Sequence, residues 1–175
     1  LMPNQVLVDR IFKHNFLCSL KSSPLSNIVY RPHVYNHKGI DDVNYLKKII
    51  PDLRVFEDLN AEERILNCRL LVSNHYGTTL YIALAHNRPL ILLWQREIME
   101  NFTEEFKNSF VSLKNAKLLF HDPVDAAMHV NKIYPNVDNW WKTELVQEAR
   151  KNWVDRYART NKNYFYEWCT GLWRM

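Results

Sequence analysis

Cysteine and glycine are both scarce in this sequence, with three residues of each among 175. The cysteines, Cys18, Cys68 and Cys169, show no paired spacing, so we expect a reduced, cytoplasmic protein rather than a disulfide framework. None of the seven histidines stands in a HExxH or CxxC…H pattern. We therefore expect no dedicated zinc site.

Long apolar runs and long basic runs are also absent. No stretch of about 18 apolar residues occurs, which argues against a transmembrane helix, and the first residues lack the pattern of a secretory signal. The formal net charge is +4, but acidic and basic residues are interspersed as on an ordinary mixed surface. Without a basic stripe we expect no nucleic-acid binding, while a positive cleft for a phosphorylated ligand stays open as an alternative.

The sequence does contain a regular alternation of strand-like and helix-like segments. Short apolar strands alternate with amphipathic helices through short connections, which is typical of an α/β fold. We predict a single domain over residues 1–175, with a Rossmann-like, doubly wound parallel sheet of about five strands in the order 3-2-1-4-5. Residues 137–175 are predicted to form a helical C-terminal extension packed on this domain.

The stretch SNHYGTT stands between the third predicted strand and the helix that follows it. Open α/β sheets bind ligands at such strand-to-helix turns. Gly77 permits a sharp turn or a close approach to a ligand. The free N–H groups of the first helical turn, at Thr78 and Thr79, favour an anion such as a phosphate. Arg31 and His33 follow the first predicted strand, and we expect them to reach the same anion.

The other predicted strands also end in polar residues that belong to the same edge. These are Glu57, Asp58, Gln95, Arg96, His121 and Asp122. Each residue of the predicted site also has an ordinary structural explanation. The Gly-Thr-Thr sequence is equally consistent with a turn and a helix cap, and Arg31 with a surface ion pair to Asp41 or Asp42. His75 fits a hydrogen-bonded loop histidine, and the position of Trp141 on an apolar helix stripe favours core packing over sugar stacking.

Several segments in a fixed order carry a resemblance to a known family. They are VYRPH, GTTLYIALAHNRPLILLW, AKLLFHDPVDAAMHV, NVDNWW and VQEARKNWVDRYARTNKN, and they cover most of the chain from Val29 onward. Through them the chain resembles the C-terminal part of a family of transferases of surface-carbohydrate biosynthesis. More distantly, it is similar to the donor-binding domain of GT-B glycosyltransferases and polyol-phosphate transferases.

The resemblance implies a domain that binds the diphosphate of a nucleotide-activated sugar as its substrate, with no metal and no cofactor. It implies a role in donor phosphate binding for His33, Arg31, Gly77, Thr78 and Thr79, and His33 is also the candidate catalytic residue. Asn74 and His75 of the same turn are further candidates for binding the donor phosphates. Because such enzymes have two domains, the resemblance also implies that catalysis needs an N-terminal domain or a partner chain.

Two residues depart from the family pattern and support an alternative function. Ile82 stands where the family has an acidic residue that holds hydroxyl groups of the donor, and Asn74 stands where an acidic residue often precedes the turn. An isoleucine accepts no hydrogen bond, which would weaken donor binding by about 1–3 kcal/mol. The alternative is a non-catalytic Rossmann-like module that docks to a partner or to a second copy of itself. A flavodoxin-like or response-regulator-like domain is a third interpretation.

Overall fold

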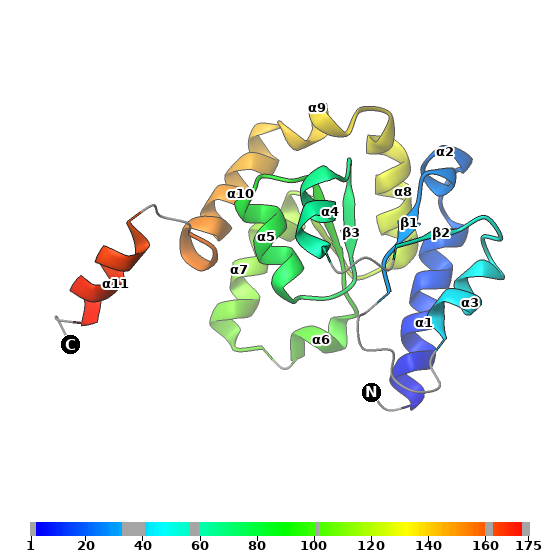
Figure 1. Cartoon of the computed structure of the whole chain (residues 1–175), viewed down its shortest axis with the longest axis horizontal. Helices are drawn as coiled ribbons and strands as arrows, with labels where there is room; N and C mark the ends of the chain where they lie inside the picture. Colours follow the sequence, from blue (N-terminus) through cyan, green and yellow to red (C-terminus); the bar gives the residue numbers. More distant parts are fainter. Residues whose placement is uncertain (1–2, 33–40, 57–59, 101, 160–162, 173–175) are drawn as a thin grey trace.

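The computed structural model describes residues 3–32, 41–56, 60–100, 102–159 and 163–172. Helices and short strands alternate along this part of the chain (Figure 1). In order they are α1 (Pro3–Cys18), α2 (Ser22–Ser26), β1 (Val29–Tyr30), α3 (Asp42–Lys47), β2 (Arg54–Val55), α4 (Ala61–Asn67), β3 (Leu71–Ser73), α5 (Thr78–Ala85), β4 (Leu90–Leu93), α6 (Arg96–Glu100), α7 (Glu104–Asn115), β5 (Leu119–Phe120), α8 (Pro123–Ile133), η1 (Tyr134–Asn136), α9 (Val137–Trp141), α10 (Glu144–Tyr157) and α11 (Tyr164–Leu172).

The strands of the described residues pair in parallel and form two small sheets. β1 pairs with β2, and Val29 lies opposite Arg54. β3, β4 and β5 form the second sheet in that order, and Val72 of β3 lies opposite Ile91 of β4. The strands of each sheet therefore end on the same side of that sheet.

The predicted strand order 3-2-1-4-5 is wrong, because β3 pairs with β4 and not with β2. The α/β class and the parallel pairing are confirmed, but the described residues do not show one continuous five-stranded Rossmann-like sheet. The strands are shorter than predicted. β1 ends at Tyr30, two residues before Pro32, which has no N–H group to continue a ladder.

β4 is the centre of the larger sheet, and both of its faces are buried. Leu90 and Leu92 belong to one hydrophobic cluster, and Ile91 and Leu93 belong to the other, as the alternation of side chains along a strand requires. Residues of α5, α7 and α10 complete the first cluster, and residues of α1, α3 and α8 complete the second. Figure 1 shows these two groups of helices on opposite sides of the strands. The prediction of a buried central strand with helices on both faces is therefore confirmed.

The C-terminal region is divided more finely than the sequence predicted. One long helix was expected over residues 137–157, but α9 ends at Trp141 and α10 begins at Glu144. Trp141 is buried, and its Nε1 donates hydrogen bonds to the backbone oxygen of Asn87 at 3.0 Å and to its Oδ1 at 2.9 Å. The prediction that Trp141 packs in the core is confirmed.

The last helix, α11, lies apart from the rest of the described chain (Figure 1). Its first residues, Tyr164, Phe165 and Tyr166, are about 70% exposed, which is unusual for consecutive aromatic side chains. In the described residues, no helix has the length and apolar character that a membrane span requires. The two clusters around β4 therefore form the core, and α11 is peripheral to both of them.

Candidate functional site

The carboxyl ends of β3, β4 and β5 lie at one edge of the larger sheet, because the strands are parallel. The turn between β3 and α5 (residues 74–77, the β3–α5 turn), α6 and the start of α8 follow these ends. Figure 1 shows α6 along this edge, at the bottom of the view. Ligands of parallel sheets bind on this side, so the candidate site is sought here.

The β3–α5 turn is held in place by hydrogen bonds among its own residues. Ser73 Oγ donates to the backbone oxygen of His75 at 2.9 Å, and the Gly77 N–H donates to His75 Nδ1 at 3.0 Å. The His75 ring also stacks on the ring of Tyr76, with centroids 5.0 Å apart. These contacts of His75 stabilise the turn. They match the alternative interpretation of His75 as a hydrogen-bonded loop histidine.

Gly77 is accommodated by the space around it rather than by an unusual backbone conformation. Its φ of −77° and ψ of −161° are extended values that any residue adopts. A Cβ atom at this position would lie 3.0 Å from His75 Nδ1 and 3.3 Å from its Cε1. Glycine thus leaves room for the His75 ring, and a larger residue would have to displace that ring.

The first turn of α5 contains backbone N–H groups that form no hydrogen bond with the β3–α5 turn. No side chain caps this helix. The N–H of Leu80 bonds to the oxygen of Gly77, whereas the N–H groups of Thr78 and Thr79 have no acceptor among the described residues. Thr78 is exposed at this position. Free N–H groups at the positive end of a helix dipole form a favourable place for an anion.

Asn74 connects the β3–α5 turn to α1. Its Nδ2 donates to Asp9 Oδ1 at 3.0 Å. The same carboxylate forms an ion pair with Lys13, with Asp9 Oδ2 and Lys13 Nζ 2.6 Å apart. The Asn74 amide is therefore oriented towards α1 and anchors one side of the turn.

Beyond Asn74, a cluster of charged residues joins α1, α3 and β1. Asp42 accepts hydrogen bonds from Lys13 Nζ at 2.8 Å and from Arg10 Nε at 3.0 Å, and Lys13 Nζ also lies 5.8 Å from the ring centre of Tyr30. Burial favours the neutral amine of Lys13, but Asp9, Tyr30 and Asp42 outweigh it and raise its pKa. Burial likewise favours neutral Asp42, but its bonds from Lys13 and Arg10 outweigh it and lower the pKa of that carboxyl group.

The comparison with known proteins identifies a family. The model of the LIC12162 family transferase matches residues 2–172 of the chain. The chain belongs to the LIC12162 transferase family. No curated protein and no solved structure matches it. The matched range includes both sheets and the β3–α5 turn, and the prediction of a transferase family is confirmed at this level.

Within this LIC12162 family chain, five of the predicted site residues lie together in and after the β3–α5 turn. They are Asn74, His75, Gly77, Thr78 and Thr79. Arg31 is exposed and directly follows β1, which belongs to the smaller sheet. His33, Glu57 and Asp58 lie outside the described residues. A phosphate-binding role for these residues, and a catalytic role for His33, stay predictions.

Three further residues named in the sequence analysis have structural roles. The Ile82 side chain is half-buried and packs against the hydrophobic cluster between the larger sheet and α10, so it cannot replace an acidic residue that holds donor hydroxyl groups. Asp42 pairs with Lys13 and Arg10, and Asp41 caps α3 by accepting from the N–H of Asn44 at 2.9 Å. These carboxylates therefore have other partners than Arg31.

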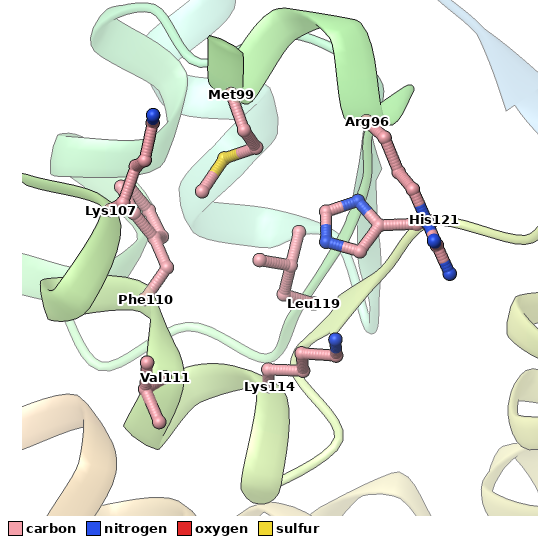
Figure 2. Close-up of a pocket in the computed structure, with 8 residues that line it drawn as sticks. All are labelled: Arg96, Met99, Lys107, Phe110, Val111, Lys114, Leu119 and His121. Atoms are coloured by element: carbon pink, nitrogen blue, oxygen red, sulfur yellow. The ribbon is translucent and has the colours of Figure 1, made fainter. Parts of the chain in front are cut away.

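Four basic residues line a cavity at the ends of β4 and β5. The sequence analysis predicted only two of them at this edge of the sheet. Arg96 and His121 were placed at this edge by their positions after the strands, whereas Lys107 and Lys114 of α7 were missed (Figure 2). The available signal was their spacing of seven residues, which puts both lysines on one face of a helix. Asp122, also predicted at this edge, caps α8 by accepting from the N–H of Val124 at 2.8 Å.

Proposed function

We propose that the chain is the donor-binding domain of a transferase that uses a nucleotide-activated sugar in the synthesis of surface carbohydrate. The observation that carries the proposal is the uncapped first turn of α5 at the carboxyl edge of a parallel sheet. The N–H groups of Thr78 and Thr79 would bind the donor diphosphate. Membership of a transferase family supports group transfer as the reaction class.

In the proposed reaction, an acceptor oxygen bonds to the anomeric carbon of the sugar while the bond from that carbon to the terminal phosphate oxygen breaks. The acceptor's proton passes to a general base, and negative charge develops on the leaving diphosphate. The free N–H groups and the dipole of α5 would stabilise that charge, with Arg31 as a further cation. The acceptor and its general base would come from a second domain or a partner chain, or the base would be His33. None of these steps calls for a cofactor.

The test is calorimetric titration of the chain with uridine, guanosine and cytidine diphosphates and their sugar esters. The informative variant is Thr78→Pro, because proline is well tolerated at the first position of a helix but has no N–H group. Glu104→Pro makes the same change at the start of α7 and is the matched control. We expect Thr78→Pro to weaken binding of one of these ligands about tenfold or more, while Glu104→Pro binds like the unaltered chain.

Two results would contradict the proposal. One is that no diphosphate or sugar ester binds the unaltered chain at about 1 mM, where the binding free energy is only about −4 kcal/mol. The other is equal binding by Thr78→Pro and Glu104→Pro, which would place the ligand elsewhere.

A second candidate function is a binding module without turnover, and the position of Ile82 favours it. The side chain of Ile82 packs on the core, so the contact to donor hydroxyl groups that the resemblance implies is missing. We would then expect neither nucleoside diphosphates nor their sugar esters to bind at about 1 mM. A sugar ester that binds the chain at this concentration would favour the donor-binding domain instead.

A further inference from the structure

The cavity between α6, α7 and the end of β5 combines an apolar floor with a basic rim. Met99, Phe110, Val111 and Leu119 line it with carbon and sulfur atoms, and the rim residues are Arg96, Lys107, Lys114 and His121 (Figure 2). Its volume is about 360 Å³, at the lower end of the range for small-molecule sites, roughly 300–1,000 Å³. A site of this composition suits a small ligand that has both an apolar part and a negative charge.

Two cations of the rim have no acidic partner among the described residues. Lys107 Nζ lies 2.7 Å from Glu104 Oε1 and is thereby paired. Arg96 and Lys114 form no ion pair within the described part of the chain. An Arg guanidinium and a Lys ammonium at one cavity mouth can both contact the oxygens of a single phosphate group.

His121 adds a group that can exchange a proton with such a ligand. Its Nδ1 lies 3.0 Å from the backbone oxygen of Trp94, and because a carbonyl oxygen only accepts, Nδ1 carries the hydrogen. In the neutral ring Nε2 is then an acceptor. Burial, with Lys114 and Arg96 nearby, lowers the pKa of His121 and outweighs the bond to Trp94 and the carboxylate of Glu97, which both raise it, so the neutral ring predominates at pH 7.

We propose that this cavity binds a small phosphate monoester whose apolar group rests on Met99 and Val111 and whose phosphate contacts Arg96, Lys114 and His121. The site lies at the ends of β4 and β5, and none of the residues that line it belongs to the β3–α5 turn or to α5. It therefore does not rest on the proposed donor site. Val111 is 53% exposed, which leaves an apolar surface at the mouth for the ligand to cover.

The experiment titrates the 175-residue chain with phenyl phosphate, inorganic phosphate and benzyl alcohol, and it follows the NMR signals of the His121 ring. We expect phenyl phosphate to bind at least about tenfold more tightly than either other probe, because only it uses both the apolar floor and the basic rim. Binding should raise the pKa of His121, since a bound anion favours the imidazolium form.

Variants distinguish binding in this cavity from nonspecific binding of anions elsewhere on the chain. Arg96→Gln and Lys114→Gln should each weaken phenyl phosphate about tenfold. Val111→Glu, at an exposed helix position where folding is preserved, should weaken it more, because a carboxylate would face the phosphate. Lys151→Gln on the exposed face of α10 and Thr78→Pro should leave it unchanged.

Four outcomes would overturn the inference. They are equal affinities for phenyl phosphate and inorganic phosphate, unchanged affinity in both rim variants, no change in the His121 signals, or no saturable binding up to about 10 mM. If no nucleotide binds the unaltered chain, or if Thr78→Pro and Glu104→Pro bind nucleotides equally, while phenyl phosphate binds as expected, only the donor-site proposal is removed.

Discussion

Asp42→Asn tests whether the charged cluster of α1, α3 and β1 stabilises the fold around the predicted site. In the structure, the Asp42 carboxylate accepts hydrogen bonds from Lys13 Nζ at 2.8 Å and Arg10 Nε at 3.0 Å, and 20% of its side chain is exposed. Asparagine has nearly the same shape but carries no charge. The substitution therefore leaves two cations facing a neutral amide.

The magnitude follows from the bonds that are weakened. A hydrogen bond to a charged group contributes about 1.5–3 kcal/mol, and two such bonds are affected. Partial exposure reduces the effect, Lys13 keeps its ion pair with Asp9, and the amide oxygen still accepts one bond. We expect the free energy of unfolding at pH 7 to fall by about 2 kcal/mol.

The pH dependence has a definite sign. The pKa of Asp42 is lowered in the folded chain, so its contribution is present above the unfolded pKa of about 4 and is lost as the pH falls through the folded value. Lys13, whose pKa is raised, stays protonated throughout this range and adds no slope. The difference between Asp42→Asn and the unaltered chain should therefore shrink towards zero below about pH 4.

Urea unfolding followed by circular dichroism, at pH 7 and at pH 3, measures this effect. Asp52→Asn is the matched control, because Asp52 is exposed in the loop before β2. The reasoning is refuted if Asp42→Asn unfolds within about 0.5 kcal/mol of the control at pH 7, or if the difference between them does not depend on pH.

Two further substitutions and one deletion test other parts of the structure. Trp141→Phe removes both hydrogen bonds to Asn87 and should lower the free energy of unfolding by about 1–3 kcal/mol in urea titrations; no loss would show that these bonds do not stabilise the fold. Burial, with Lys132 and Lys117, lowers the pKa of His129 to about 4, so stability should fall between about pH 6.5 and pH 4, and His129→Phe should flatten this part of the stability curve. Deleting residues 159–175 removes α11, which lies apart from both core clusters, and should change the Tm by less than about 2 °C; a larger drop would mean that α11 stabilises the core.

The alternation of elements and the helix starts could be predicted from the sequence because they depend on local chemistry. Asp122 followed by Pro123 marks the start of α8, and its carboxylate accepts from the N–H groups of Val124 and Asp125. Thr103 caps α7 by accepting from the N–H of Phe106. Such signals act within one helical turn and can therefore be read directly from the sequence.

The location of the β3–α5 turn was also predicted, but the roles of its residues were not. Nothing local indicates that the Asn74 amide turns towards Asp9, 65 positions earlier. For His75, the sequence left both a ligand role and a hydrogen-bonded loop histidine open, and the structure shows its Nδ1 accepting from the Gly77 N–H. Which acceptor a polar side chain reaches depends on where distant helices pack.

The sequence alone therefore determined the alternation of the main helices and strands, that β4 is buried on both faces, and that a strand-to-helix turn lies at residues 74–77, whereas the short helices α2 and α6 were not predicted. These follow from the spacing of apolar residues and from caps, which act over a few residues. Only the tertiary structure decided that β3 pairs with β4, and that Lys107 and Lys114 meet His121 at one cavity. Strand pairing and the packing of helices around a cavity depend on contacts between residues far apart in the chain. The spacing of apolar residues along the sequence does not indicate these contacts.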